Sequence, residues 1–296
     1  MKNYKIILDT DIGDDIDDAF ALALLIKENV SLLGVTTVFK NSVQRAKIVK
    51  YELEQYGINN VEVYAGYDKP LVKDIIKWGY ETINADGRIN IKHYNEELMR
   101  NCKINETGAV DFILNTIKEN PNEVTLIAIG PLTNIAMAIK KDIETFKKVK
   151  CILMMGGEKK GTYPEWNIKI DPQAANIVFN SKVPIKSVGV DITSLCKFTN
   201  EDINKIHRIN GPLKIVSNMM DIWIHDNPLK MPTMHDPLAV SELFNHFCKY
   251  EDVRFIVDEN TGKFIIGDDK PYCIKMANSV KKEEFINYLL NKLKEK

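Results

Sequence analysis

Close to its N-terminus the 296-residue chain reads Lys5-Ile-Ile-Leu-Asp-Thr-Asp-Ile-Gly-Asp-Asp-Ile-Asp-Asp-Ala-Phe-Ala-Leu22. Residues 6–8 are apolar, which is typical of a short buried strand. Six aspartates follow within ten residues, and an unbroken apolar run from residue 19 indicates a helix. Carboxylates this crowded repel one another at short range. A hard cation with oxygen ligands would relieve the repulsion, so the acidic turn is a candidate cation site.

Two simpler explanations account for less of this turn. Asp17 or Asp18 could cap the following helix, where an anionic side chain satisfies free N–H groups. Capping explains one or two of the six carboxylates. An EF-hand loop fails on spacing, because with Asp9 at position 1 the glycine falls at position 5 instead of 6, and position 12 is Phe20 instead of glutamate.

The composition narrows the class of protein. The formal net charge is −1 with no basic patch, so nucleic acid is not an expected partner. No apolar run has membrane-spanning length, and the N-terminus lacks a signal-peptide pattern. The cysteines form no CxxC pair, which favours a reducing compartment and predicts a cytoplasmic protein. The five are Cys102, Cys151, Cys196, Cys248 and Cys273.

Apolar strands alternate with helical patterns along most of the chain. After the first strand, further strands are expected at residues 31–38, 61–64, 124–129, 149–155 and 185–190, with helices between them. This order predicts an α/β fold: an open, mostly parallel, doubly wound sheet with helices on both faces. With no linker visible, residues 1–296 are expected to form a single domain.

The second half is less regular. The pattern predicts helices at residues 200–227, from 238 and at 281–294, and a small β-hairpin of residues 255–257 and 263–266. Residues 158–170 are expected to be a loop, after which Asp171-Pro172 begins a helix. Residues 74–107 show only weak periodicity and receive no assignment.

Unusual polar residues follow the expected strands at their carboxyl ends, where open parallel sheets bind ligands. They include the acidic turn, Asn41, residues 130–134 and Asp191, together with the later loops of residues 165–167 and 235–236. A hard cation would fit Asp11, Asp18 and Asp236 plus a backbone carbonyl. Sequence alone does not show that Asp236 reaches the first turn.

Several motifs together resemble the inosine–uridine-type nucleoside hydrolase family. Its N-terminal pattern is DxDPGxDDA, and the matches continue in the family's order over nearly the whole chain. They are Asp9-Thr-Asp-Ile-Gly13 with Asp17-Asp18-Ala19, Gly130-Pro-Leu-Thr-Asn-Ile-Ala136, Met155-Gly-Gly157, Glu165-Trp-Asn167 with Asp171-Pro172, Val190-Asp-Ile-Thr193, and His235-Asp236.

The resemblance implies calcium-dependent hydrolysis of the N-glycosidic bond of a ribonucleoside. It implies catalytic roles for Asp11 as general base and His235 as candidate acid. The implied Ca²⁺ ligands are Asp11, Asp18, Asp236 and the carbonyl of Ile129. The implied substrate contacts are Asp17, Asn41, Met155, Glu165 and Asn167. Relatives are commonly dimers or tetramers, so a homodimer or homotetramer is expected by resemblance.

This chemistry suits the residue types. Cleaving the C1′–N bond develops an oxocarbenium-like cation, which carboxylates stabilise electrostatically. Histidine is the side chain best suited to protonate a leaving base near neutral pH. Trp223 and His225 are candidates for the base pocket, although an ordinary amphipathic helix end explains them equally well.

The chain departs from the family pattern at three places. Ile12 replaces the usual proline, and two extra residues precede the Asp17-Asp18 pair, so Asp14 or Asp15 could join the metal shell. Gly161-Thr162 stands where the family has Gly-Asn. Base preference cannot be read from these residues.

Two other functions share part of this pattern with hydrolysis of nucleosides. A haloacid-dehalogenase-type phosphohydrolase also has an Asp-x-Asp turn, but its pattern gives no role to Asp17 and Asp18. A calcium-dependent nucleoside- or ribose-binding protein without turnover would not require both Asp11 and His235. A fold resemblance alone would not decide between them.

Overall fold

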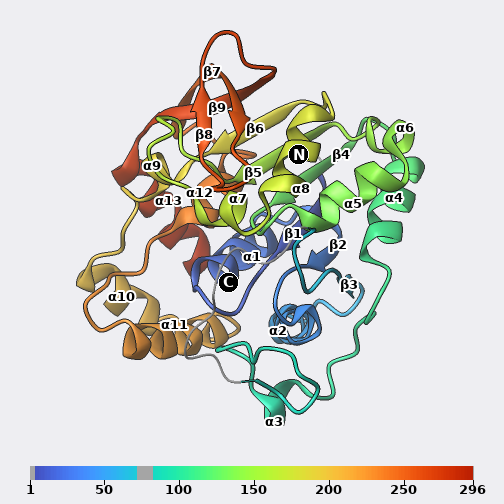
Figure 1. The fold of residues 1–296 in the computed structure, drawn as a ribbon. Helices are drawn as coiled ribbons and strands as arrows, with labels where there is room; N and C mark the ends of the chain where they lie inside the picture. The colour runs from blue at the N-terminus through green and yellow to red at the C-terminus, as the bar shows by residue number, and fades with distance from the viewer. Residues whose placement is uncertain (1–3, 72–82, 296) are drawn as a thin grey trace.

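The computed structural model describes residues 4–71 and 83–295, and the described strands form one nine-stranded sheet (Figure 1). The strand order is β3-β2-β1-β4-β5-β6-β9-β7-β8. Neighbours from β3 to β9 are parallel, whereas β7 is antiparallel to both β9 and β8. The strands are β1 (Lys5–Thr10), β2 (Ser31–Thr37), β3 (Glu62–Ala65), β4 (Val124–Ala128), β5 (Cys151–Met155), β6 (Ile185–Val188), β7 (Cys248–Val257), β8 (Phe264–Ile266) and β9 (Tyr272–Val280).

Helices cover both faces of the sheet, and each face has its own apolar core. On β1 the side chains of Ile6 and Leu8 belong to one core and that of Ile7 to the other, as strand alternation requires. The first core packs under α1 (Asp17–Lys27), α2 (Ser42–Gln55), α10 (Asn200–His207), α11 (Lys214–Asp226), α12 (His235–Ser241) and α13 (Lys282–Lys294). The second packs under α4 (Ala109–Glu119), α5 (Thr133–Lys141), α6 (Ile143–Phe146) and α8 (Pro172–Asn180).

These observations confirm the predicted fold class, but the C-terminal strands are more extensive than the expected hairpin. The β7–β8 hairpin exists, and β9 inserts between β6 and β7 to join it to the parallel part. Strand β9 buries Tyr272, Ile274 and Met276 and exposes Cys273 and Lys275. Apolar and polar residues alternate along this stretch, which is a weaker signal than the continuous apolar runs of the strands buried on both faces.

Three other segments differ from the expected elements. The helical region of residues 200–227 is two helices, because Gly211 takes a positive φ of 87° and Pro212 follows it. The expected loop of residues 158–170 ends in α7 (Trp166–Ile170), and Val190 begins the short helix α9 (Val190–Thr193) instead of ending a strand. Within residues 74–107, residues 74–82 lie outside the described part, and α3 (Glu96–Met99) is the helix in the remainder.

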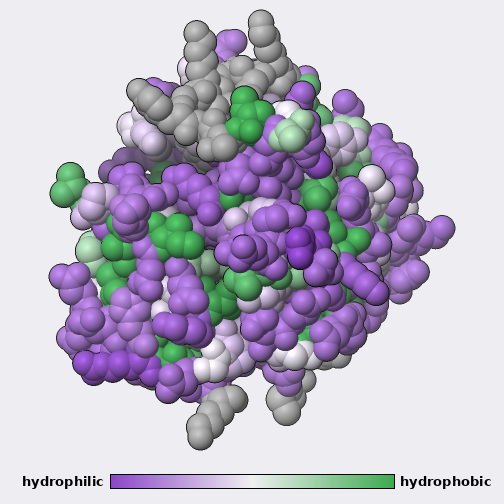
Figure 2. Space-filling view, turned by 90° about the horizontal axis from the view of Figure 1, so that it is seen from below, coloured by the Kyte–Doolittle hydropathy of each residue, from purple (hydrophilic) through white to green (hydrophobic). Residues whose placement is uncertain are grey.

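The surface seen from below is mainly hydrophilic, with apolar side chains in separate patches (Figure 2). Among residues 4–71 and 83–295, no helix combines the length and the apolar character needed to cross a bilayer.

Candidate active site

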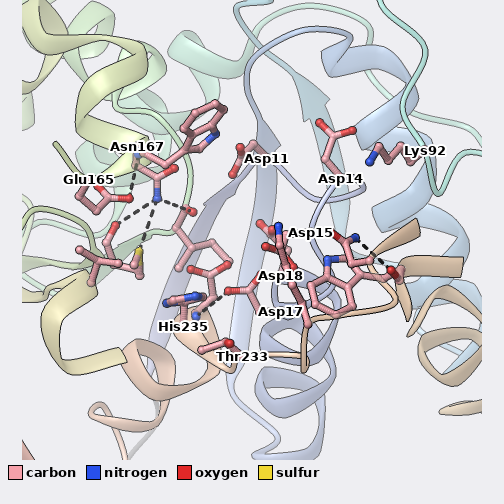
Figure 3. A pocket seen from close by; sticks show the side chains of 18 of the residues that line it. Asp11, Asp14, Asp15, Asp17, Asp18, Lys92, Glu165, Asn167, Thr233 and His235 are labelled. Carbon is pink, nitrogen blue, oxygen red and sulfur yellow. Dashed lines mark hydrogen bonds between the residues drawn. The ribbon is translucent and has the colours of Figure 1, made fainter. Parts of the chain in front are cut away.

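The acidic turn between β1 and α1 lines a cavity of about 850 Å³ together with residues from the distant loops (Figure 3). Strand β1 lies in the parallel part of the sheet between β2 and β4, so its carboxyl end faces the site where open sheets bind ligands. Ten of the predicted site residues line this cavity. They are Asp11, Asp17, Asp18, Ile129, Met155, Glu165, Asn167, Trp223, His235 and Asp236.

Three carboxylates converge in the cavity and could hold a metal ion. Asp17, Asp18 and Asp236 are buried, and each offers a carboxylate oxygen within 4.8 Å of the others. The backbone N–H of Asp236 donates to Asp17 Oδ2 at 3.2 Å, which joins the start of α12 to the start of α1. The fold therefore brings Asp236 to the first turn. Asp17 is a member of this close set, whereas the resemblance implied Asp11.

The three carboxyl groups are buried away from water, which disfavours their ionised forms. Burial raises the pKa of Asp17, Asp18 and Asp236 well above the ordinary value, and the charges of neighbouring carboxylates raise it further. The added charge is that of Asp15 at Asp17, whereas Asp17 acts on both Asp18 and Asp236. The charge of Asp11 adds to the effect at Asp18 and Asp236, which places Asp11 beside the group. A bound divalent cation would favour the ionised form of all four carboxylates.

Asp11 stands directly after β1 and is held close to the neighbouring loop. Burial raises its pKa to about 6, and the charge of Arg45 opposes this shift. A Cβ atom on Gly130 would lie 2.9 Å from the backbone nitrogen of Asp11, so only glycine allows this approach. An acid with a raised pKa at a cavity wall is suited to accept a proton.

Glu165 and Asn167 form a second wall of the cavity. Glu165 caps α7 by accepting from the backbone N–H of Asn167 at 2.9 Å, and it also accepts from Gly157 N–H at 3.0 Å. The amide of Asn167 donates to the carbonyl oxygens of Ile129 at 3.0 Å and of Met155 at 3.3 Å. Burial raises the pKa of Glu165 to about 7. These bonds hold both side chains in fixed positions.

His235 begins α12 next to the carboxylate group. Its Nδ1 lies 2.6 Å from the Thr193 hydroxyl, on α9. Burial, with a smaller contribution from Lys197, lowers the pKa of His235 to about 4, so its ring is neutral at pH 7. If the hydroxyl donates to Nδ1, the other nitrogen carries the N–H.

Two predicted site residues do not line the cavity. The Asn41 side chain caps α2 by accepting from Gln44 N–H at 3.1 Å. The side chain of His225 is 89% exposed at the end of α11.

The inserted acids line the cavity but are not members of the close set of three carboxylates, although the charge of Asp15 raises the pKa of Asp17. Asp14 pairs with Arg45 at 2.8 Å and with Lys40 at 2.9 Å. Burial would raise the pKa of Asp14, but the charges of Arg45 and Lys40 lower it to about 2. Asp15 accepts from the N–H of Ile16 at 2.7 Å. Asp14 is therefore an ion-pair partner in this structure.

Several residues that line the cavity were not predicted from the sequence. Phe39 and Lys40, directly before Asn41, take positive φ angles of 74° and 60° and line the wall beside the acidic turn. Their position after the second strand was the available signal. The others carried no recognisable pattern, and include Lys92, Tyr163, Lys197, Leu229 and Lys230.

Known proteins with similar sequences belong to the family that the motifs of this chain resemble. The sequence profile of the inosine-uridine preferring nucleoside hydrolase family matches residues 6–287. The chain is 33% identical over 278 residues to an inosine-uridine preferring nucleoside hydrolase of Crithidia fasciculata, covering 89% of this chain and 86% of that one. It is 31% identical over 280 residues to a pyrimidine-specific ribonucleoside hydrolase of Escherichia coli, covering 88% and 85%.

Solved structures agree in fold. A purine-preferring ribonucleoside hydrolase from Gardnerella vaginalis superposes with a TM-score of 0.80 at 25% identity over 98% of each chain. A plant nucleoside hydrolase superposes with a TM-score of 0.82 at 24% identity over 99% of each chain, which shows the shared fold. The chain belongs to the inosine-uridine preferring nucleoside hydrolase family and is an enzyme that cleaves the N-glycosidic bond of ribonucleosides.

Proposed function

We propose that this nucleoside hydrolase works with a calcium ion held by Asp17, Asp18 and Asp236, with Asp11 beside them. The observation that carries the proposal is the convergence of three buried carboxylates from two segments 219 residues apart. Carboxylate oxygens are hard donors, which suit Ca²⁺ better than a soft metal. Ile129 lines the same cavity, and its backbone carbonyl, which accepts from the Asn167 amide, would be a further oxygen ligand.

Calcium bound to these residues would lower the pKa of a water molecule and provide an anchor for hydroxyl groups of the sugar. Asp11 takes a proton from the attacking water. The water oxygen forms a bond to C1′ while the C1′–N bond breaks, and the base departs with the bonding electron pair. Asp11 is assigned this task because it lines the cavity directly beside the three carboxylates and, with a cation bound, would be ionised and able to accept a proton.

The remaining wall residues act on the sugar and on the base. The buried carboxylates stabilise positive charge that develops on the ribose in the transition state. Glu165 and Asn167, which are held by hydrogen bonds at the start of α7, contact the ribose hydroxyls in this proposal, and Met155 lies beside Asn167. His235 assists departure of the base through Nε2, the ring nitrogen that does not face Thr193, and Trp223 forms part of the base pocket.

The base preference of this chain is a separate question, because relatives are named for inosine and uridine, for pyrimidine nucleosides and for purine nucleosides. The test is release of ribose from a panel of purine and pyrimidine ribonucleosides, with calcium present or removed by a chelator. We expect release from at least one nucleoside, lost with the chelator and restored by added calcium. Release that persists unchanged in chelator would contradict the calcium proposal.

A further inference from the structure

Arg45 is a charged side chain with no exposed surface, and it lies on α2 behind the wall of the cavity. Its guanidinium donates from every nitrogen. Nε donates to the carbonyl of Phe39 at 2.9 Å, and Nη1 donates to the carbonyls of Asp11 and of Ile12, the latter at 2.7 Å. Nη2 donates to the carboxylate of Asp14 at 2.8 Å.

These bonds connect the two turns that border the cavity beside α2. One is the acidic turn of residues 11–18, and the other is the turn after β2 that contains Phe39 and Lys40. Two consecutive residues other than glycine at positive φ make the second turn unfavourable by itself. The backbone N–H groups of Phe39 and Lys40 donate to the carbonyls of Tyr67 at 2.7 Å and Asp68 at 2.8 Å, and these hydrogen bonds support the turn. The hydrogen bond from Arg45 to the Phe39 carbonyl links this turn to the acidic turn.

The acidic turn has a particular need for such support. In the family pattern a proline stands where this chain has Ile12, and proline restricts the backbone by fixing φ. This chain also carries the inserted acids Asp14 and Asp15, which make the turn longer. The carbonyls bonded by Arg45 are those of Asp11 and Ile12, on either side of the bond at which that restriction is missing. Asp14 accepts from the same guanidinium, so the insertion supplies one of its partners.

We propose that Arg45, together with Asp14, is a positioning residue that holds the backbone of the acidic turn so that the Asp11 carboxylate stays directed at the cation and the substrate. The inference rests on the proposed function of Asp11 and goes beyond it by assigning the fixed shape of the turn to one buried side chain. The planar guanidinium donates in several fixed directions at once, which a lysine ammonium at this position would not reproduce.

A purely structural role must be separated from positioning, and Lys50 offers a matched control. It is a second buried cation on α2, and its Nζ donates to the carbonyls of Asn59 at 3.1 Å and Val61 at 3.3 Å. Lys50 does not line the cavity in the part of the chain that the structure describes. Arg45→Met and Lys50→Met each remove a buried cation bonded to carbonyl groups, and only the first loosens the acidic turn.

The experiment measures calcium binding to each metal-free variant by calorimetric titration, and kcat and KM at saturating calcium. Partners that orient metal ligands typically contribute about 10- to 100-fold to metal affinity or activity. We therefore expect Arg45→Met to weaken calcium binding and lower kcat by about tenfold or more each, with Arg45→Lys between it and wild type. Lys50→Met is expected to keep both within about twofold while lowering Tm.

Wild-type calcium affinity and kcat in folded Arg45→Met would overturn the inference, as would equal losses in Lys50→Met. If Arg45→Met does not fold, Asp14→Asn decides. A fall of about threefold or more in the calcium affinity of folded Asp14→Asn supports the inference, and unchanged affinity overturns it. A wild type that hydrolyses nucleosides without binding calcium would instead contradict the calcium proposal, and the kcat ratios of the same variants would still decide the role of Arg45.

Discussion

Two regions of the molecule keep carboxyl groups away from water, with different consequences. In the cavity, Asp17, Asp18 and Asp236 come together from separate segments and share a small space. In the last turn of α2, Glu52 is also fully buried, but neither of its carboxylate oxygens has a hydrogen-bond partner among the described residues. Burial raises the pKa of all four acids.

The difference shows that burial alone does not identify a functional acid. At Glu52 burial is the only cause of the raised pKa, so the simplest state is a neutral carboxylic acid within the apolar core. In the cavity, neighbouring carboxylates raise the pKa beyond the effect of burial, and a bound cation would offset the repulsion between their charges. Convergence of several acids therefore distinguishes the site, and the two regions should respond differently when one acid is neutralised.

The largest expected effect comes from Asp11→Asn. Because the amide cannot accept the proton of the attacking water, kcat should fall by about 1000-fold. Steady-state kinetics at saturating calcium measure this, with Glu52→Gln as the control for loss of a buried carboxylate. Activity within about tenfold of wild type would show that another group is the base.

An effect of intermediate size is expected from removal of calcium, which should lower the stability of the folded enzyme. A ligand at 100 times its Kd stabilises the folded state by about 2.7 kcal/mol, so a chelator should lower the Tm of wild type. Thermal unfolding with and without chelator measures the shift. Asp236→Asn should show little dependence on calcium, and an equal calcium-dependent shift in this variant would argue against the proposed site.

The smallest expected effect is a gain in stability from Glu52→Gln. The raised pKa means that the folded state binds a proton which the unfolded chain releases above its ordinary pKa of 4.5, so Glu52 costs stability as pH rises. Removing the acid should add about 2 kcal/mol at pH 8 and nothing near pH 4. Urea unfolding at both pH values checks the sign. A loss of stability at pH 8 would indicate an ionised Glu52 with an unrecognised partner.

Much of the parallel half of the fold was predictable because its strands are buried on both faces and read as apolar runs. Residues 6–8 and 124–129 are examples, and each lies within or overlaps an observed strand. Strand β9 was not predictable in this way, because one face of it is polar and exposed.

Residues of the site were predictable from the sequence where a local motif or the family resemblance identified them. Asp17 and Asp18 are adjacent in sequence, but their approach to Asp236 depends on how α12 packs against α1, which no local pattern encodes. Asn41 and His225 were predicted site residues that do not line the cavity. Each was predicted from its position in the sequence. The Asn41 side chain instead caps its own helix, and the His225 side chain is exposed to solvent. Backbone geometry and side-chain direction decide such cases.

Calcium titration of three proteins, each followed by ribose release from the same sample, tests the central claim most directly. The proteins are wild type, Asp236→Asn and Glu52→Gln. We predict that wild type and Glu52→Gln bind calcium with similar affinity and release ribose, whereas Asp236→Asn loses both properties together. Asp236→Asn with wild-type calcium affinity and turnover would contradict the assignment of the metal site to the converging carboxylates.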